Sequence, residues 1–398
     1  MVTEWKIINL SKNSKIKARI GWQGLTTAEY LNEGYSYLIT GTDMKAGRVD
    51  WKNCHYVTYE RYAQDPNIQV TNGDLLISKD GTIGKIALVT ELSSPATLNS
   101  GVFVIRPITD AYISEYMFYV LESFIFKNFL KQLSAGSTIN HLYQKDIVKF
   151  ECILPPVIEQ KRISELLSDM DALIVDLQKL IRKKKDIRQG TMQMLVTGKK
   201  RLPGYYADFE HFAIGELGSL AKTSINPCQE PKTIFDEYSM PAFDNGAKPQ
   251  QMLGELMLSS RIKLTPNTLL FNKLNVRQRR VWFVKDCSNN SVCSSEFLPY
   301  KSEKIDLSFL KQLLLTDKAT KDFEDMSSGT SNSQQRITPS DFLKYEISIP
   351  SLEEQREISS ILLDMDIEIQ KLEEKLSKCQ KVKQGMMEEL LTGKVRLM

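Results

Sequence analysis

The sequence of 398 residues lacks the features of a membrane or secreted protein. It has no run of about 18 apolar residues, the length that crosses a bilayer as a helix. Its first residues, MVTEWKIINLSKNSK, do not place an apolar stretch behind a positively charged start, as a signal peptide would. We therefore expect a soluble, cytoplasmic protein with no contact to a membrane.

Cysteine and histidine are scarce, and neither is arranged for chemistry. The six cysteines form no CxxC pair, so the pattern argues against a disulfide framework and a zinc site, and free thiols fit a reducing compartment. The three histidines do not cluster with a serine or cysteine nucleophile. The cysteines are Cys54, Cys152, Cys228, Cys287, Cys293 and Cys379, and the histidines are His55, His141 and His211.

Several short motifs resemble catalytic ones and fail on spacing. GTIGK (81–85) lacks the GxxxxGK[ST] spacing of a phosphate loop and has Ile86 where serine or threonine would bind magnesium. NPCQ (226–229) departs from the adenine methyltransferase motif after two residues. EQK (159–161) and EEK (373–375) have the ExK form of a nuclease centre but lie on long predicted helices without an acidic partner. We predict no catalytic residues, no cofactor and no metal.

One segment of the chain is present twice. ILPPVIEQKRISELLSDMDALIVDLQKL (153–180) aligns without a gap with SIPSLEEQREISSILLDMDIEIQKLEEK (348–375), and the likeness continues to LVTGKKRL (195–202) and LLTGKVRL (390–397). Roughly 21 of 50 paired positions are identical. This period far exceeds the roughly 20–50 residues of a solenoid repeat, so each copy should be a domain plus a connecting element.

The repeated segments show apolar residues at heptad spacing over about 35–40 residues, which predicts two long helices with a stripe to bury. The economical partner for each helix is its duplicate, and the connectivity favours an antiparallel pair with a pseudo-twofold axis. The alternative is that each helix is a core helix of its own half. The predicted first-copy rows are Ile163, Met170 and Leu177, with Leu166, Leu173, Leu180 and Ile187. The second-copy rows are Ile358, Met365, Leu372, Cys379 and Met386, with Leu362, Ile369, Leu376 and Leu390.

Two globular halves, 1–152 and 203–347, share landmarks although their sequences have diverged. GDLLISKDGTIGKIALV (73–89) and NTLLFNKLNVRQRRVWFV (267–284) each predict a hairpin with a polar, basic loop. GSTINHLYQKDIVKFECILP (136–155) and TSNSQQRITPSDFLKYEISIP (330–350) predict a second matching loop before each helix. Asparagine, glutamine and arginine in these loops are side chains that read base edges in the major groove.

The positive charge is local rather than global, since the net charge is only +3. Residues 256–285 and 5–28 contain no aspartate or glutamate, and both segments carry several lysines and arginines that could neutralise phosphates. The alternative is a solvated basic surface with ordinary polar loops.

The motifs together resemble the specificity (S) subunit of type I restriction–modification systems, over essentially the whole chain. The carriers are the two copies of P-x(4)-Q-x(2)-I with LLSDMDALI and LLDMDIEI, the two closing LxTGKxRL segments, RIGWQGL (19–25), GDLLISKDGTIG and LLFNKLNVRQRRVW. The resemblance implies two target-recognition domains that each read half of a split, asymmetric site in double-stranded DNA. It also implies an antiparallel helical pair that sets their spacing and docks two modification (methyltransferase) subunits, with restriction (motor-nuclease) subunits joining.

We accordingly predict an α+β chain with two tandem α/β target-recognition domains and two pairing helices. The segments are 1–152, 153–202, 203–347 and 348–398. A coiled-coil scaffold without a DNA role and an unrecognised DNA-modifying enzyme are the rival hypotheses. The residues predicted to bind DNA are Arg19, Trp22, Gln23, Lys79, Thr82, Lys85, Ser137, Thr138, Asn140 and His141 in the first half. In the second half they are Lys273, Asn275, Arg277, Gln278, Arg279, Arg280, Ser331, Asn332, Gln334, Gln335 and Arg336.

Overall fold

The computed structural model describes residues 4–133, 141–329 and 334–397. The chain divides into two compact units, and each unit combines one globular half with part of both long helices. The first unit comprises Met1–Gln178 and Glu374–Met398, and the second comprises Lys179–Glu373. Within the described residues, no helix has a stretch that is both long and apolar enough to span a membrane.

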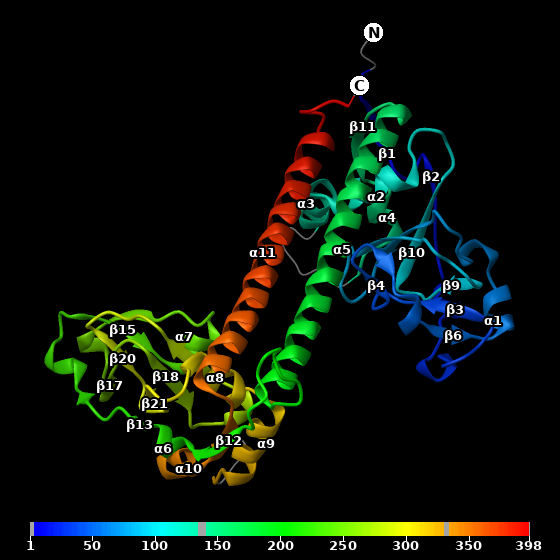
Figure 1. Ribbon diagram of the computed structural model, residues 1–398. Helices are drawn as coiled ribbons and strands as arrows, with labels where there is room; N and C mark the ends of the chain where they lie inside the picture. Colours follow the sequence, from blue (N-terminus) through cyan, green and yellow to red (C-terminus); the bar gives the residue numbers. More distant parts are fainter. Residues whose placement is uncertain (1–3, 134–140, 330–333, 398) are drawn as a thin grey trace. The chain divides into compact units, whose positions relative to one another are not determined.

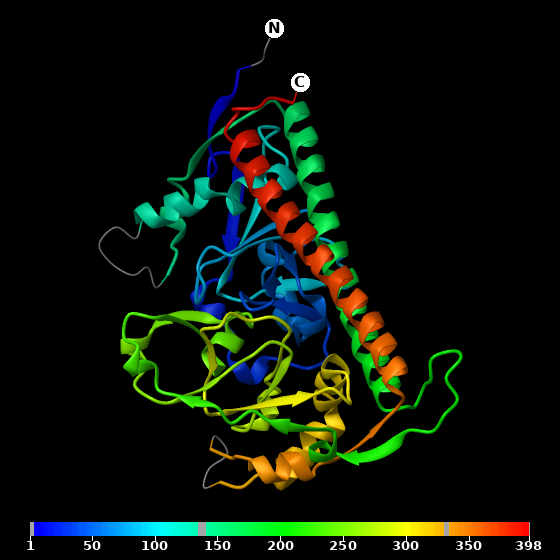
Figure 2. The ribbon, with the colours of Figure 1, turned by 60° about the vertical axis from the view of Figure 1, so that its left-hand side comes forward.

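Two long helices, α5 (Val157–Val196) and α11 (Leu352–Leu390), lie side by side (Figures 1 and 2). Each ends shortly before a glycine in the left-handed region, Gly198 at φ +71° and Gly393 at φ +74°. Glycine is favoured at this position because a side chain there would clash with the backbone. The two predicted long helices are therefore confirmed.

Ion pairs within each unit show that the helices are antiparallel. In the first unit, Lys383 Nζ lies 2.6 Å from Asp171 Oδ1. In the second, Arg188 Nη2 lies 2.9 Å from Asp366 Oδ2. Asp171 and Asp366 occupy one position of the repeat, as do Arg188 and Lys383, so the same contact is made twice. The duplicated sequence therefore makes the same helix–helix contact once in each unit.

The predicted seam was wrong in one row of α5. Ile163 and Leu177 are buried, but the second buried row runs through Leu167 and Ile181 and not through the predicted Leu166 row. Residues on one helical face alternate steps of four and three, and a shift of one residue turns a side chain by about 100°. The side chains predicted as buried and found 39–46% exposed are Leu166, Leu173, Leu180 and Ile187.

In α11 the predicted rows follow the buried face. Ile358, Leu362, Ile369 and Leu390 are buried, and Met365 packs against the core of the second unit. Leu372 is partly buried at the next position of the same row. The buried residues of α5 align with the buried residues of α11 in the repeat, so the sequence of the second copy indicates the correct rows of the first.

The repeated closing phrase folds back onto the start of the other helix. Arg396 donates through Nε and Nη2 to the two carboxylate oxygens of Glu159, both at 2.8 Å, in the first turns of α5. Arg201 donates in the same way to Glu354 in α11, at 3.0 and 2.6 Å. Both carboxylates are almost completely buried. We call these two arrangements the closing contacts.

An aromatic ring completes each closing contact. The Arg396 guanidinium lies 5.5 Å from the Trp5 ring centre, and that ring covers Gly393, where an added Cβ would be only 3.3 Å away. Arg201 lies 4.9 Å from the Phe209 ring, which covers the matching glycine of the first copy. The phrase LxTGKxRL is therefore conserved between the copies because each unit needs it once.

The first globular half contains a four-stranded antiparallel sheet in the order β2-β10-β7-β8, a three-stranded sheet β6-β3-β9 and the short pair β4-β5. β1 pairs with β11, the strand that leads into α5. Its strands are β1 (Lys6–Asn9), β2 (Ser14–Ala18), β3 (Ser36–Ile39), β4 (Met44–Lys45), β5 (Arg48–Val49), β6 (His55–Val57), β7 (Leu75–Ser78), β8 (Ile86–Leu88), β9 (Ala96–Leu98), β10 (Val102–Pro107) and β11 (Glu151–Leu154). Its helices are α1 (Tyr59–Ala63), α2 (Ser114–Glu122), α3 (Phe124–Leu133) and α4 (Gln144–Ile147).

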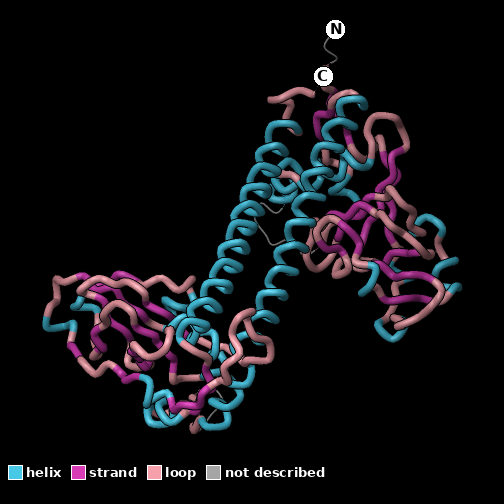
Figure 3. The backbone as a smooth tube through the Cα atoms, viewed as in Figure 1, coloured by secondary structure: helices cyan, strands magenta, loops and turns pink. Residues whose placement is uncertain are grey.

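The second half repeats this plan with a sheet β13-β21-β18-β19 and a larger, five-stranded second sheet β14-β17-β20-β15-β16. Figure 3 shows the strands of both halves in magenta. β12 pairs with β22 before α11. Its strands are β12 (Glu210–Ala213), β13 (Gly218–Leu220), β14 (Ser224–Ile225), β15 (Ile234–Tyr238), β16 (Gln250–Leu253), β17 (Arg261–Lys263), β18 (Thr268–Asn272), β19 (Val281–Val284), β20 (Ser291–Cys293), β21 (Phe297–Ser302) and β22 (Glu346–Ile349). Its helices are α6 (Ile214–Leu217), α7 (Met240–Asp244), α8 (Leu307–Leu314), α9 (Asp317–Met326) and α10 (Pro339–Lys344).

One inner strand of each four-stranded sheet, β7 or β18, is buried on both faces. Leu75 and Ile77 of β7 pack in a core with α2 and the long helices, while Leu76 packs in the core of the second sheet. In β18, Leu269 and Leu270 divide in the same way. Because successive strand residues point to opposite faces, the apolar runs LLI and LLF fit this position between two cores.

Candidate nucleic-acid interface

The first predicted hairpin loop joins β7 to β8. Gly81 and Gly84 both have positive φ, at +67° and +78°, as a tight turn between strands requires. Ser78 Oγ accepts a hydrogen bond from the Lys85 N–H at 2.9 Å and donates one to the Thr82 carbonyl at 2.6 Å. The loop is thus fixed from beneath, and the Thr82 side chain is exposed at its tip.

The two lysines of this loop have uncharged partners. Lys79 Nζ lies 5.2 Å from the centre of the Phe103 ring. Lys85 Nζ donates to the carbonyl of Gly41 at 3.0 Å. Neither partner offsets the ammonium charge, so both lysines can still attract a phosphate.

The second hairpin loop joins β18 to β19, is one residue longer than the first and contains a short 3-10 helix, Val276–Gln278. Asn275 (φ +53°) and Arg279 (φ +50°) take the left-handed conformations that glycines take in the first loop. Such a conformation costs a non-glycine residue about 1 kcal/mol. The second hairpin therefore holds an arginine where backbone geometry favours glycine.

The arginines of the second hairpin are ion-paired. Arg280 donates from Nε and Nη2 to the two oxygens of Asp244, both at 2.8 Å. Arg279 Nη2 lies 2.6 Å from Asp317 Oδ1. The hydrogen bond from Arg280 lowers the pKa of Asp244, and those from Arg279 and Gln193 lower the pKa of Asp317. Both carboxylates are therefore ionised at neutral pH.

In each unit the structure brings the hairpin loop and the loop before the long helix together. The Leu142 N–H donates to the Lys79 carbonyl at 2.9 Å, and the Ile337 N–H donates to the Lys273 carbonyl at 3.1 Å. Leu142 and Ile337 occupy one position of the repeat. The same backbone bond thus builds one continuous two-loop surface in each half, which we call the first and second two-loop surfaces.

Further contacts join or flank the two loops on these surfaces. His141 Nδ1 contacts the carboxylate of Asp80 on the first. On the second, the Asn275 N–H donates to the Gln335 carbonyl at 2.8 Å, and Arg336 lies 3.1 Å from Glu296. Gln278, Gln334 and the Arg277 side chain are exposed.

Some predicted residues lie outside the described part of the chain. They are Ser137, Thr138, Asn140, Ser331 and Asn332, together with the side chain of Trp22. Their predicted contacts with DNA stay predictions.

Arg19 and Gln23 are buried, with 2% and 6% of their surface exposed. Arg19 Nε donates to the Leu98 carbonyl at 2.8 Å and Nη2 to Thr97 Oγ1 at 3.2 Å. Burial, and next the nearby Arg61, lower the pKa of this guanidinium. In this structure Arg19 binds two residues of β9, and neither the Arg19 nor the Gln23 side chain reaches the surface of the first globular half, so their placement does not support direct DNA contact.

Sequence reasoning missed two kinds of residue near these surfaces. The exposed ring of Tyr143 lies beside the first surface, with Lys145 Nζ 5.2 Å from its centre. The carboxylates that hold the second-surface arginines were also missed, because Asp244 is 36 positions from Arg280 and Asp317 is 38 from Arg279. Only tertiary structure brings such pairs together.

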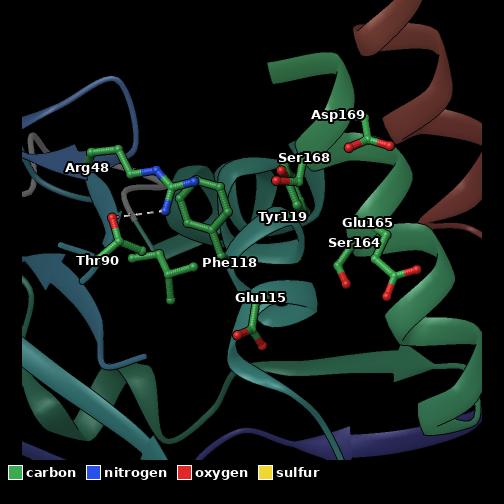
Figure 4. A pocket seen from close by; sticks show the side chains of 10 residues that line it. Arg48, Thr90, Glu115, Phe118, Tyr119, Ser164, Glu165, Ser168 and Asp169 are labelled. Carbon is green, nitrogen blue, oxygen red and sulfur yellow. Dashed lines mark hydrogen bonds between the residues drawn. The ribbon is translucent and has the colours of Figure 1, made fainter. Parts of the chain in front are cut away.

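A cavity of about 340 Å³ lies between the first globular half and α5 (Figure 4). Arg48, which donates to Thr90 Oγ1 at 3.3 Å, lines one side, and Glu165 and Asp169 of α5 line the other. The second unit has a cavity of about 640 Å³ at the corresponding place, between β19, α8 and α11. Within the described residues, no cluster of histidine, cysteine and acidic side chains is arranged to hold a metal.

Comparisons with known proteins agree with this two-fold plan. The family described as "Type I restriction modification DNA specificity domain" matches residues 21–188 and again 208–379. The MjaVIII type I restriction enzyme specificity subunit of Methanocaldococcus jannaschii is 26% identical over 371 residues, which cover 83% of this chain and 82% of that protein.

Two solved structures share the fold. The type I restriction–modification system S subunit from M. genitalium aligns with a TM-score of 0.60 at 14% identity, over 98% of this chain and 96% of that chain. A structure described as showing complex assembly and conformational transition of the type I R-M system aligns with a TM-score of 0.56, also at 14% identity, over 98% of both chains.

Proposed function

Because the chain belongs to the family of type I restriction–modification specificity proteins, with the family's domain present twice, we propose that its two halves read the two parts of a bipartite, asymmetric DNA site. Each two-loop surface would face one half-site in double-stranded DNA. Phosphate contacts from lysines and arginines would position the chain, and contacts to base edges would specify the sequence.

The proposal rests on a backbone arrangement that is the same in both halves, whereas the exposed side chains differ. The backbone bond from Leu142 to Lys79 recurs as the bond from Ile337 to Lys273, so both halves build the same platform. The exposed polar side chains on the platform differ, because the first hairpin loop presents Thr82 and the second presents Gln278. Two similar platforms with different polar side chains favour the reading of two different half-sites over a scaffold without a DNA role.

The test is to map the methylated sites of the complete complex in a host genome by methylation-sensitive sequencing. The double substitution Q278A/Q334A should relax one half-site and leave the other intact. T82A, the matched change on the first surface, should affect only the opposite half-site. If both sets of substitutions altered the same half-site, or neither altered any, the assignment of one half-site to each surface would be wrong.

We further propose that the helical pair sets the spacing of the half-sites and docks two modification subunits, with restriction subunits joining that core. α5 presents an exposed apolar row at seven-residue spacing, whose members are 39–52% exposed. Charged residues occupy three of the five matching positions of α11. The row consists of Leu166, Leu173, Leu180, Ile187 and Met194. The cavity beside the long helices in each unit offers one further contact per half.

Replacing Leu173 by glutamate should weaken co-purification of the modification subunit, because a charge would have to be buried at the interface. Val175, which is similarly exposed (43% against 40%) but points away from the row, provides the matched control V175E. Equal effects of L173E and V175E, with both chains folded, would show that the row is not the docking surface.

Under this proposal the chain supplies register and sequence, and catalysis resides in its partners. The four segments 1–152, 153–202, 203–347 and 348–398 then act as reader, spacer, reader and spacer. Purified chain mixed with labelled S-adenosylmethionine should bind none of it. Stoichiometric binding would favour the rival hypothesis of an unrecognised methyltransferase.

A further inference from the structure

We propose that four carboxylates of the second unit, Asp244, Glu296, Asp317 and Glu324, neutralise the arginines of the second two-loop surface and so keep it from binding DNA of the wrong sequence. The inference rests on the proposed function, because it assumes that this surface meets DNA. It goes further by assigning specificity to acidic residues that themselves repel the ligand.

Two of the arginines bind their carboxylates through the guanidinium edge that would otherwise bind nucleic acid. Arg280 uses Nε and Nη2 to bind both oxygens of Asp244, and Arg336 uses the same two atoms to bind Glu296, at 3.2 and 3.1 Å. This two-pronged edge is one that binds a phosphate or the O6 and N7 atoms of guanine. While the carboxylate is bound, DNA must displace it or use another edge.

The other two arginines pair with one helix. Arg279 binds Asp317 at the start of α9, and Arg277 lies 3.7 Å from Glu324, two helical turns further along. The α9 helix therefore presents an acidic face to the hairpin loop. Asp317 also accepts a hydrogen bond from Gln193 of α5 at 2.7 Å, which fixes its position independently of the arginine.

These carboxylates come from parts of the chain distant in sequence. Residues 256–285 contain no acidic residue, and yet every arginine of the hairpin loop within that segment meets a carboxylate from α7 or α9. A surface that is strongly basic in sequence is thus close to neutral in structure.

The first two-loop surface provides the contrast. Lys79 and Lys85, which occupy the hairpin positions of Lys273 and Arg280, contact an aromatic ring and a backbone carbonyl. Their charges remain uncompensated by these partners. The two surfaces therefore differ: the lysines of the first can attract any DNA by charge, whereas the four arginines of the second must exchange their ion pairs to bind.

The ion pairs are weak enough for DNA to displace them. The four pairs are partly exposed, with the Asp317 side chain 67% exposed and the Asp244 side chain 53% exposed. Exposed pairs of this kind contribute little to stability. A matching half-site can replace them with several contacts at once, whereas a non-matching sequence offers only phosphates and gains no counterion release from an arginine that is already neutralised.

The test compares the full-length chain with D244N and with the double variant D244N/D317N. Binding is measured by fluorescence anisotropy on a labelled 30-base-pair duplex that lacks the mapped site, from 50 to 300 mM salt. E373Q is the matched control, because it removes one negative charge and breaks the exposed Lys185–Glu373 ion pair on the helices. Specific binding is measured with the modification subunits present, on a duplex that carries the site.

Each released arginine adds about one phosphate contact, so the slope of log K against log salt should steepen by about 0.9 per carboxylate. At 0.1 M salt this corresponds to a gain of roughly eightfold per contact in non-specific affinity. Specific affinity should change less, so that the ratio of specific to non-specific binding falls. E373Q should leave the slope unchanged.

Unchanged non-specific affinity and slope in both variants would overturn the inference. A loss of specific affinity without a gain in non-specific affinity would also overturn it, because the carboxylates would then be positioning residues that orient the arginines for reading. If neither the wild-type complex nor any variant bound the mapped site, the proposed function itself would be wrong, which is a separate outcome.

Discussion

A fragment that ends at Leu202 should form a symmetric dimer, because the duplication gives it both partners of every repeated contact. Such a fragment keeps the first globular half and α5, and it loses Glu374–Met398, which completes the first unit. A second copy of the fragment can supply the same elements. Its Arg188 stands at the position of Lys383 and its Arg201 at the position of Arg396.

The magnitude follows from the contacts exchanged. In each unit the partner copy would replace the buried Leu390 and Leu391 with Leu195 and Val196, which are buried in their own unit. Four such side chains in the dimer give about 6–12 kcal/mol at about 1.5–3 kcal/mol each. Two closing contacts from Arg201 to Glu159 then satisfy carboxylates that would otherwise be buried without a partner. The sum is comparable with the roughly 4–15 kcal/mol lost on association, so we expect a dimer at micromolar concentration.

Sedimentation equilibrium measures the mass, and circular dichroism checks that the fragment is folded. With modification subunits, methylation mapping should return a palindrome made of the first half-site and its inverted copy. The substitution R201A in the fragment should weaken dimerisation, whereas K199A, which alters the same phrase at a residue outside the closing contact, should not. A folded fragment that binds its modification subunit and stays monomeric would refute the exchange of these contacts.

The remaining predictions concern the whole chain. R396A should lower the stability of the first unit by about 3–5 kcal/mol, because it leaves the buried Glu159 carboxylate without its cation; hydrogen exchange would locate the loss, and an effect confined to the second unit would contradict it. Burial alone would raise the pKa of Glu159, but the bonds from Arg396 and the adjacent backbone N–H lower it overall. This contribution should therefore be complete above about pH 4.5 and disappear as pH falls through the lowered value, and thermal unfolding of E159Q should show a weaker acid dependence. Burial raises the pKa of the Cys54 and Cys293 thiols to about 12, so iodoacetamide at pH 8 should modify them only after unfolding. Seven residues inserted at the middle of both α5 and α11 add about 10 Å to the pair, which should lengthen the spacer by about 3 base pairs and leave both half-sites unchanged; altered half-sites with an unchanged spacer would exclude a spacing role.

The long helices and their antiparallel pairing could be predicted from sequence because their causes are local and repeated. Apolar spacing, flanking prolines and terminal glycines lie within a few residues of the feature they determine. The error in the Leu166 row arose because α5 has a second apolar row one residue away from the buried one. The second copy distinguishes the buried row from the exposed row, because Glu368 and Lys375 occupy the positions that Leu173 and Leu180 occupy in the first copy.

The candidate site could be predicted only in outline. The two hairpins and the loops before the helices were found as a set, and each unit joins them through one backbone bond. The burial of Arg19 against Thr97 and Leu98 depends on a partner nearly 80 positions away, which its own neighbours do not reveal. The neutralisation of Arg279 and Arg280 likewise depends on α7 and α9. Charge counted along the chain therefore overestimated the charge on the surface.

The closing contacts also determine the order in which the chain can mature on the ribosome. The core of the first unit includes Leu390 and Leu391, and its Glu159 binds Arg396. Those residues are synthesised after the whole second unit, Lys179–Glu373, whose hydrophobic core lies within these bounds. The second unit can therefore complete its fold first, although domains generally fold in order from the N-terminus. The first globular half must therefore keep an open core, with Glu159 unpaired, until residues 390–396 have been synthesised, and loss of those residues would damage the half encoded at the beginning of the message.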